Sequence, residues 1–85
     1  MTATIEVRFR LYANLRDATG CEWVTVQAPD RSTVASAFAI AAADHPTLRD
    51  WEGRVAFARN ARILRPDTEV AAGDELDALP PVSGG

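Results

Sequence analysis

The sequence predicts a single α+β domain, in which a mixed sheet of four to five strands carries one main helix across one face. Three observations lead to this prediction: a period-two stretch near the N-terminus, one helical stripe in the middle of the chain, and several short strand-like segments after it. The chain has 85 residues, which suffices for one modest core but not for a second domain or a deep substrate cavity.

The first half of the chain predicts two strands around a short helical turn. Residues 4–12 alternate between apolar and charged side chains, and a period of two is typical of a half-buried strand. The apolar side carries Ile5, Val7, Phe9 and Leu11, and the charged side carries Glu6, Arg8 and Arg10. The segment 12–20 interrupts this pattern and is expected to hold one helical turn that ends at Gly20. Residues 21–28 predict the second strand, which Pro29 ends.

The middle of the chain predicts the main helix over residues 33–44. Ser32 or Thr33 can cap it, because a hydroxyl accepts a hydrogen bond from an amide at a helix N-terminus. Pro46 stops it. The stripe expected to face the sheet contains Val34, Phe38, Ala41 and Ala42. Residues 47–53 are expected to form a loop, with Trp51 as a lid on the core.

The second half predicts three more strands, over residues 54–59, 63–64 and 75–79, separated by turns at 60–62, 66–67 and 72–74. A hairpin, one helix and further strands suit a single sheet with the helix across one face, which is the β-grasp arrangement. We assign residues 1–79 to this domain and residues 80–85 to an extended C-terminal tail.

Composition excludes several kinds of function. The net charge of −3 argues against general nucleic-acid binding, which uses a basic surface. All nine basic residues are arginine, so the chain lacks the lysine of a Walker A phosphate loop. The chain has one cysteine and one histidine, which are too few for a structural zinc site or an internal disulfide. No uninterrupted apolar run begins the chain, so we expect a cytoplasmic protein with no membrane partner. We also expect no bound metal or cofactor.

The tail carries the strongest functional signal. It reads Pro80-Pro81-Val82-Ser83-Gly84-Gly85. The prolines favour an extended conformation, and six residues at about 3.3 Å each span about 20 Å. The final glycines lack side chains, so they can pass a constriction in a partner protein and leave the terminal carboxylate of Gly85 accessible. We expect the tail from Val82 onward to be mobile in the free protein.

These features resemble the small subunit of molybdopterin synthase, a family of ubiquitin-like sulfur carriers. The resemblance covers nearly the whole chain: RFRLYANLRDATG at residues 8–20, the turn Ala58-Arg59-Asn60, the segment Ala72-Gly73-Asp74-Glu75-Leu76, and the ending PPVSGG. The turn departs from the family pattern, which commonly has Val-Asn where this chain has Arg59-Asn60.

The resemblance implies a mechanism and its partners. An adenylyltransferase of the ubiquitin-activating type would use ATP to adenylate the Gly85 carboxylate, and a sulfur donor would convert the product to a thiocarboxylate. The large subunit of molybdopterin synthase would then receive the sulfur for a pterin precursor, in a heterotetramer. The residues threaded into the partners would be Pro81, Val82, Ser83, Gly84 and Gly85. An apolar docking patch is implied at Tyr12, Ile63 and Leu79, although each of these could instead belong to the core.

The other reactive side chains predict local roles. Cys21 is expected to be a small buried apolar residue, and His45 to cap a helix or lie at the surface. The arginines at 54, 59, 62 and 65 suit either a solvated face or docking against an acidic partner. Asp74 and Glu75 could suggest acid–base chemistry, but in a turn before a strand they more simply serve the turn.

Alternative functions remain open at this point. A sulfur carrier for thiamin thiazole or cysteine synthesis would share the fold and the Gly-Gly end. A ubiquitin-like protein modifier would use the same tail, although the lack of lysine excludes lysine-linked chains of this protein. A β-grasp interaction module with an inert tail is the third alternative. A freestanding enzyme is the weakest, because no nucleophile–base pair, metal set or nucleotide loop can be assembled.

Overall fold

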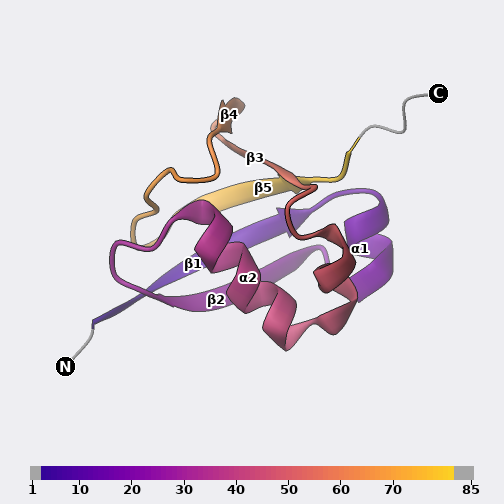
Figure 1. The fold of residues 1–85 in the computed structure, drawn as a ribbon, viewed down its shortest axis with the longest axis horizontal. Coiled ribbons are helices and arrows are strands. Elements are labelled where there is room, and N and C mark those ends of the chain that lie inside the picture. Colours follow the sequence, from indigo (N-terminus) through magenta and orange to yellow (C-terminus); the bar gives the residue numbers. More distant parts are fainter. Residues whose placement is uncertain (1–2, 82–85) are drawn as a thin grey trace.

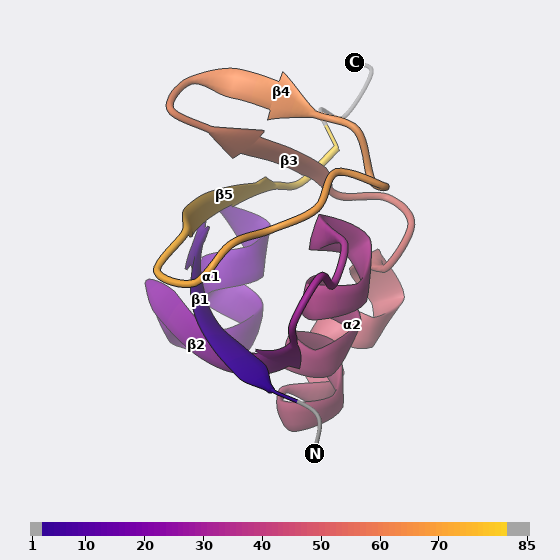
Figure 2. The same cartoon turned by 90° about the vertical axis from the view of Figure 1, so that its left-hand side faces the viewer.

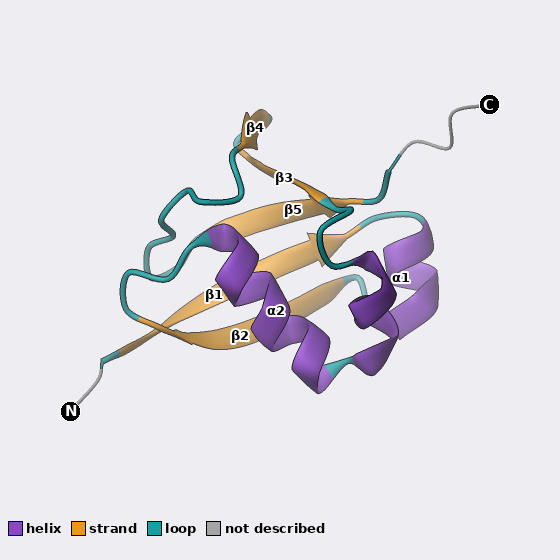
Figure 3. Ribbon diagram, in the orientation of Figure 1, coloured by secondary structure: helices purple, strands orange, loops and turns teal. Residues whose placement is uncertain are grey.

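The computed structural model describes residues 3–81 and has the predicted α+β architecture, with five strands in one sheet (Figures 1 and 3). The strand order is β2-β1-β5-β3-β4. The sheet is mixed, because β1 and β5 run parallel whereas every other neighbouring pair is antiparallel. Figure 2 shows α2 on one side of this sheet, with β2 and β4 at its opposite edges.

The N-terminal hairpin follows the sequence pattern closely. Strand β1 (Thr4–Leu11) buries Val7, Phe9 and Leu11 and is followed by helix α1 (Asn14–Thr19). Gly20 ends α1 with a φ of 72°, a left-handed conformation that glycine adopts without steric cost. Strand β2 (Trp23–Pro29) begins two residues later than predicted and includes Pro29.

Helix α2 (Val34–Asp44) crosses the inner face of the sheet, as predicted. Thr33, rather than Ser32, caps it, because its hydroxyl accepts a hydrogen bond from the amide of Ser36. The predicted stripe is buried, and Phe38 packs against Phe9 and Phe57 with ring centroids 5.5 and 5.4 Å apart. Such aromatic pairs add about 0.5–1.5 kcal/mol each beyond the burial of their surface.

The segment after α2 differs from the prediction. Residues Pro46–Trp51 form a 3₁₀ helix, η1, where a loop was expected over 47–53. Leu48 on η1 is fully buried, and this explains the difference, because a helical turn both buries that side chain and bonds the local backbone. Trp51 is partly buried against the core, which confirms its predicted place as a lid.

The C-terminal strands complete the sheet. Strand β3 (Ala56–Arg59) begins two residues later than predicted, and a two-residue turn at Asn60 and Ala61 joins it to β4 (Arg62–Leu64). Strand β5 (Glu75–Leu79) then enters between β1 and β3. Insertion of the last strand beside the first places the root of the tail in the middle of the sheet rather than at an edge.

Candidate functional site: the tail root and the outer face

The tail leaves the domain directly after β5. Leu79 and Pro80 are partly buried and Pro81 is exposed. The other predicted tail residues, Val82, Ser83, Gly84 and Gly85, lie outside the described residues, and so does the predicted mobility of the tail. The described part of the site is therefore the root of the tail and the surface around it.

The outer face of the sheet, opposite α2, carries one continuous row of residues across all five strands. In strand order, the row contains Trp23, Arg10, Asp77, Ala58 and Ile63. Leu79 lies two residues beyond Asp77 on β5 and pairs with Ala56 on β3. Successive side chains in a strand alternate between faces, so Leu79 and Ala56 also belong to the outer face.

Tyr12 joins this face through a hydrogen bond. Its hydroxyl donates to Oδ1 of Asp77 over 3.0 Å. Partial burial, followed by the hydrogen bond and the charge of Asp77, raises the pKa of the Tyr12 phenol above its ordinary value of 10.0. The hydroxyl therefore stays protonated at neutral pH and can keep donating to the Asp77 carboxylate.

The three residues predicted as a docking patch share the outer face. Ile63 is 69% exposed, and among residues 3–81 no other large hydrophobic side chain is as exposed. Tyr12 and Leu79 are partly exposed. Ile63 lies two strands from β5, which is about 10 Å at a spacing of about 4.8 Å per strand. We call Tyr12, Ala56, Ile63 and Leu79 the tail-side patch; its role in docking stays a prediction.

Charged and aromatic side chains occupy the rest of the outer face. The guanidinium of Arg8 lies 4.3 Å from the Trp23 ring centroid and bonds the Glu75 carboxylate at 2.8 Å. Arg10 lies between the rings of Trp23 and Tyr12, at 5.7 and 5.5 Å. The face is thus divided into an apolar part near the tail and a charged part over β1 and β2.

Asp77, Ala58 and Ala56 belong to this surface although the sequence pattern did not predict it. Asp77, which anchors Tyr12, was not singled out, although its place two residues before Leu79 puts it on the same side of the strand. Ala58 is 4% exposed and lies between Asp77 and Ile63 in the row, where its small side chain adds no bulk to the surface. A single alanine inside a strand gives no signal of either role.

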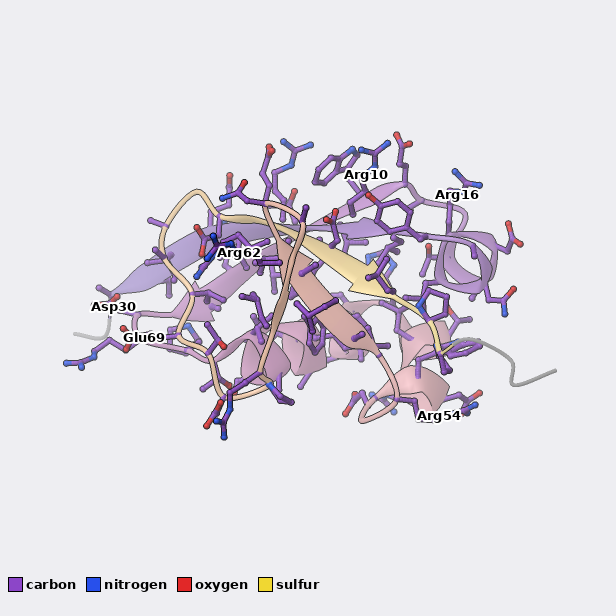
Figure 4. All side chains as sticks on the ribbon, turned by 90° about the horizontal axis from the view of Figure 1, so that it is seen from above. Arg10, Arg16, Asp30, Arg54, Arg62 and Glu69 are labelled. Atoms are coloured by element: carbon purple, nitrogen blue, oxygen red, sulfur yellow. The ribbon has the colours of Figure 1, made fainter. Side chains whose placement is uncertain are left out.

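The sequence cluster of arginines does not form one surface. Arg59 bonds Asp74 at 2.7 Å, Arg65 pairs with Asp67, and Arg54 lies over the Trp51 ring. Figure 4 shows Arg54 and Arg62 well apart in the molecule. The closeness of these residues along the chain is therefore not matched by closeness in space.

The remaining candidates have local roles. Asp74 accepts hydrogen bonds from the Arg59 side chain and the Ala71 amide, so it serves the turn, as expected. The His45 amide closes α2 on the carbonyl of Ala41, which agrees with a capping position. The Cys21 thiol donates a weak hydrogen bond to the Thr19 carbonyl at 3.6 Å and is partly buried against the core.

Residues 3–81 contain no pocket and no group of side chains that could hold a metal ion. None of the helices in this described range has the length and apolarity to cross a membrane.

A β-grasp domain with this tail root and exposed patch defines a ubiquitin-like protein. The chain matches the ThiS family over residues 9–85, and it belongs to that family. The molybdopterin synthase sulfur carrier subunit of Arabidopsis thaliana is 30% identical over 84 residues, which cover 99% of this chain and 88% of that protein.

Two further relatives are similar in sequence or structure. Small archaeal modifier protein 1 of Haloferax volcanii is 32% identical, with 93% of this chain and 100% of that protein covered. A crystal structure of that protein superposes with a TM-score of 0.80 over 94% of this chain and 99% of that one. One chain of a protein–protein complex of subunits 1 and 2 of molybdopterin-converting factor from Helicobacter pylori 26695 matches with a TM-score of 0.64 and 24% identity. The match covers 95% of this chain and 100% of that chain, and at this identity it concerns the fold alone.

Proposed function

We propose that this chain is a sulfur carrier for molybdenum cofactor synthesis, and that it carries sulfur as a thiocarboxylate on Gly85. The observation that carries the proposal is the position of the tail root. The central strand β5 ends beside the tail-side patch, so a partner that holds this patch also receives the chain that continues to Gly-Gly. The sequence similarity to a molybdopterin synthase sulfur carrier subunit supports this choice.

The proposed chemistry takes place in partner proteins. The Gly85 carboxylate attacks the α-phosphate of ATP and releases pyrophosphate, which gives an acyl-adenylate. A carboxylate is a poor electrophile, whereas the acyl-adenylate has a good leaving group in AMP. Hydrosulfide, or sulfur delivered at the same oxidation level, forms a C–S bond at the acyl carbon as the bond to AMP breaks. The resulting thiocarboxylate is an anionic nucleophile near neutral pH.

The carrier itself contributes positioning. Docking through a rigid β-grasp domain places the thiocarboxylate in the partner's site and converts a bimolecular sulfur transfer into a nearly unimolecular one. We propose two successive partners: an adenylyltransferase of the ubiquitin-activating type, and the large subunit of molybdopterin synthase. Both would contact the tail-side patch and enclose residues 81–85.

A second candidate function is protein modification. The specific observation that favours it is the 32% identity to small archaeal modifier protein 1 over its whole length. In this case the Gly85 adenylate would be attacked by a lysine amine of a target instead of by sulfur. The lack of lysine in this chain excludes lysine-linked chains of such a modifier, because no lysine is present for a second copy to join.

Variants of the last two residues test the carrier function. Deletion of Gly85 moves the terminal carboxylate by about 3.3 Å, and misplacement of about 1 Å can already cost about a hundredfold in rate. We expect the deletion variant to lose adenylation and sulfur transfer to the pterin precursor while its unfolding transition is unchanged. Gly84→Val should lose nearly as much, whereas Gly84→Ala, the smaller change, should lose less.

The acceptor decides between the candidate functions. Reconstitution with the large subunit of molybdopterin synthase, or with enzymes of thiamin thiazole or cysteine synthesis, shows which protein takes the sulfur. Molybdopterin formation by the Gly85 deletion variant would disprove the carrier proposal. Recovery of covalent conjugates to target lysines, without sulfur transfer, would establish the modifier function instead.

A further inference from the structure

The strand β2 forms an edge of the sheet that is protected only at its last residue. It lies at the opposite end of the strand order from β4, and none of its seven side chains from Trp23 to Pro29 is charged. Natural proteins usually protect edge strands with charges, proline, bulges or short length, because a free edge can pair with another strand. Of these devices β2 has only a proline, Pro29, which is its last residue and lies beyond Trp23, Thr25 and Gln27. Strand β4 follows this rule, since it has three residues and begins with Arg62.

The hydrogen-bond pattern shows which backbone groups of β2 face outward. The Leu11 amide bonds the Glu22 carbonyl at one end of the β1–β2 pair, and the Asp30 amide bonds the Ala3 carbonyl at the other end. Hydrogen-bonded pairs alternate with non-bonded pairs in an antiparallel ladder. In the continuous register of this hairpin, the even-numbered residues Val24, Val26 and Ala28 therefore bond β1.

The odd-numbered residues of β2 point the other way. Trp23, Thr25 and Gln27 direct their amides and carbonyls to the free edge. No described residue supplies a backbone or side-chain hydrogen bond to these groups. Their side chains lie on the outer face, so the edge combines unpaired backbone with uncharged, strand-forming residues.

We propose that this edge pairs with the same edge of a second copy of the chain, to give a dimer with one continuous ten-stranded sheet. Antiparallel pairing about a two-fold axis at Thr25 places Thr25 opposite Thr25 and Trp23 opposite Gln27. Each of these pairs contains only outward-facing residues, so the three pairs can form about six hydrogen bonds. This register is self-complementary, which is what a two-fold symmetric interface requires.

The side chains in this register also match. Thr25 meets its own copy, and a threonine pair is favourable across antiparallel strands. On the inner face, Val24 meets Val26 of the second copy, and no charged residue of β2 lies opposite another. Helix α2, which packs on β2, has small exposed side chains before Asp44, namely Ala35, Ser36, Ala39 and Ala43, and its larger, partly exposed Ile40 packs against the core.

The dimer leaves the tail root free. Strand β2 is separated from β5 by β1, and the tail-side patch extends from β5 toward β4, away from the paired edge. This assembly therefore does not depend on the proposed function and would present two tails at once. Edge pairing buries little surface, so we expect a dissociation constant of about 0.1–1 mM, typical of a weak association.

The test combines hydrogen exchange and sedimentation on the full chain between about 0.01 and 1 mM. The amides of Trp23, Thr25 and Gln27 should become protected as concentration rises, while those of Val24, Val26 and Ala28 are protected throughout. Thr25→Glu places two carboxylates opposite each other and should weaken dimerisation at least about tenfold. The fold tolerates it, because Arg8 lies beside position 25 on β1.

Thr47→Glu is the matched control, because it makes the same change at an exposed position on η1. It should dimerise like the native chain. A chain that stays monomeric at about 1 mM would overturn the proposal. Dimerisation that survives Thr25→Glu, equal loss in both variants, or protection that does not follow the odd-numbered residues would overturn it as well.

Discussion

Substitution of Ile63 by aspartate should separate partner binding from stability. Ile63 is 69% exposed on β4, so only about a third of its full burial energy is lost, about 0.5–1 kcal/mol. The lower strand preference of aspartate adds up to about 1 kcal/mol. We therefore expect the free energy of unfolding to fall by less than about 2 kcal/mol, and the folded domain to persist.

The effect on binding should be larger, because a charge in a desolvated contact is costly. We expect the affinity for the large subunit of molybdopterin synthase to fall at least about tenfold, which is about 1.4 kcal/mol. Phe57→Ala, on the other face of the same hairpin, should show the reverse pattern. Phe57 is 6% exposed, and its truncation should cost about 3–5 kcal/mol of stability.

Calorimetric titration with the large subunit measures the affinity, and urea unfolding measures the stability. Ile63→Val is the control, since it keeps an apolar, β-branched side chain and should preserve both quantities. Native affinity in Ile63→Asp would refute the assignment of the patch. A loss of stability as large as that of Phe57→Ala would show that Ile63 belongs to the core.

Two further predictions concern stability. Ala61→Gly should stabilise the domain by about 0.5 kcal/mol in urea unfolding, because Ala61 has a φ of 66° and left-handed strain of about 1–2 kcal/mol exceeds the entropy cost of glycine; a destabilised variant would contradict this. Tyr12→Phe should cost about 0.5 kcal/mol near neutral pH. Because folding raises the pKa of Tyr12, the phenol contributes its full stabilisation below pH 10.0 and loses it as pH rises through the folded-state pKa. The difference in the free energy of unfolding between the native chain and Tyr12→Phe should therefore shrink over that range. Tyr12 is the single tyrosine, so tyrosinate absorbance measures this pKa directly, and a midpoint at or below 10.0 would refute the Asp77 contact.

The main elements could be predicted because their signals are local. The alternation of residues 4–11 and the stripe of α2 each bury a defined face, and Gly20 and Thr33 mark helix ends by their backbone and hydroxyl chemistry. The helix η1 could not be predicted, because six residues contain no period and only Leu48 is buried. The burial of Val70, which is 3% exposed in an irregular segment, could not be predicted for the same reason.

The site was less predictable than the fold, since it depends on strand order. Placement of β5 between β1 and β3 brings Tyr12 to Asp77 and sets Asp77 opposite Ala58, and no local pattern specifies these neighbours. Tyr12, Ile63 and Leu79 came from the family resemblance rather than from periodicity. The arginines at 54, 59, 62 and 65 show the same dependence, because closeness along the chain does not specify a shared surface.

The intact mass of the protein isolated from its own cells tests the central claim most directly. A fraction of the chains should be heavier by the difference between one sulfur and one oxygen atom, and fragmentation should place that difference on Gly85. The heavier fraction should disappear when the activating enzyme is removed. A population that carries only the ordinary carboxylate, under conditions in which the cell makes molybdenum cofactor, would contradict the sulfur-carrier account.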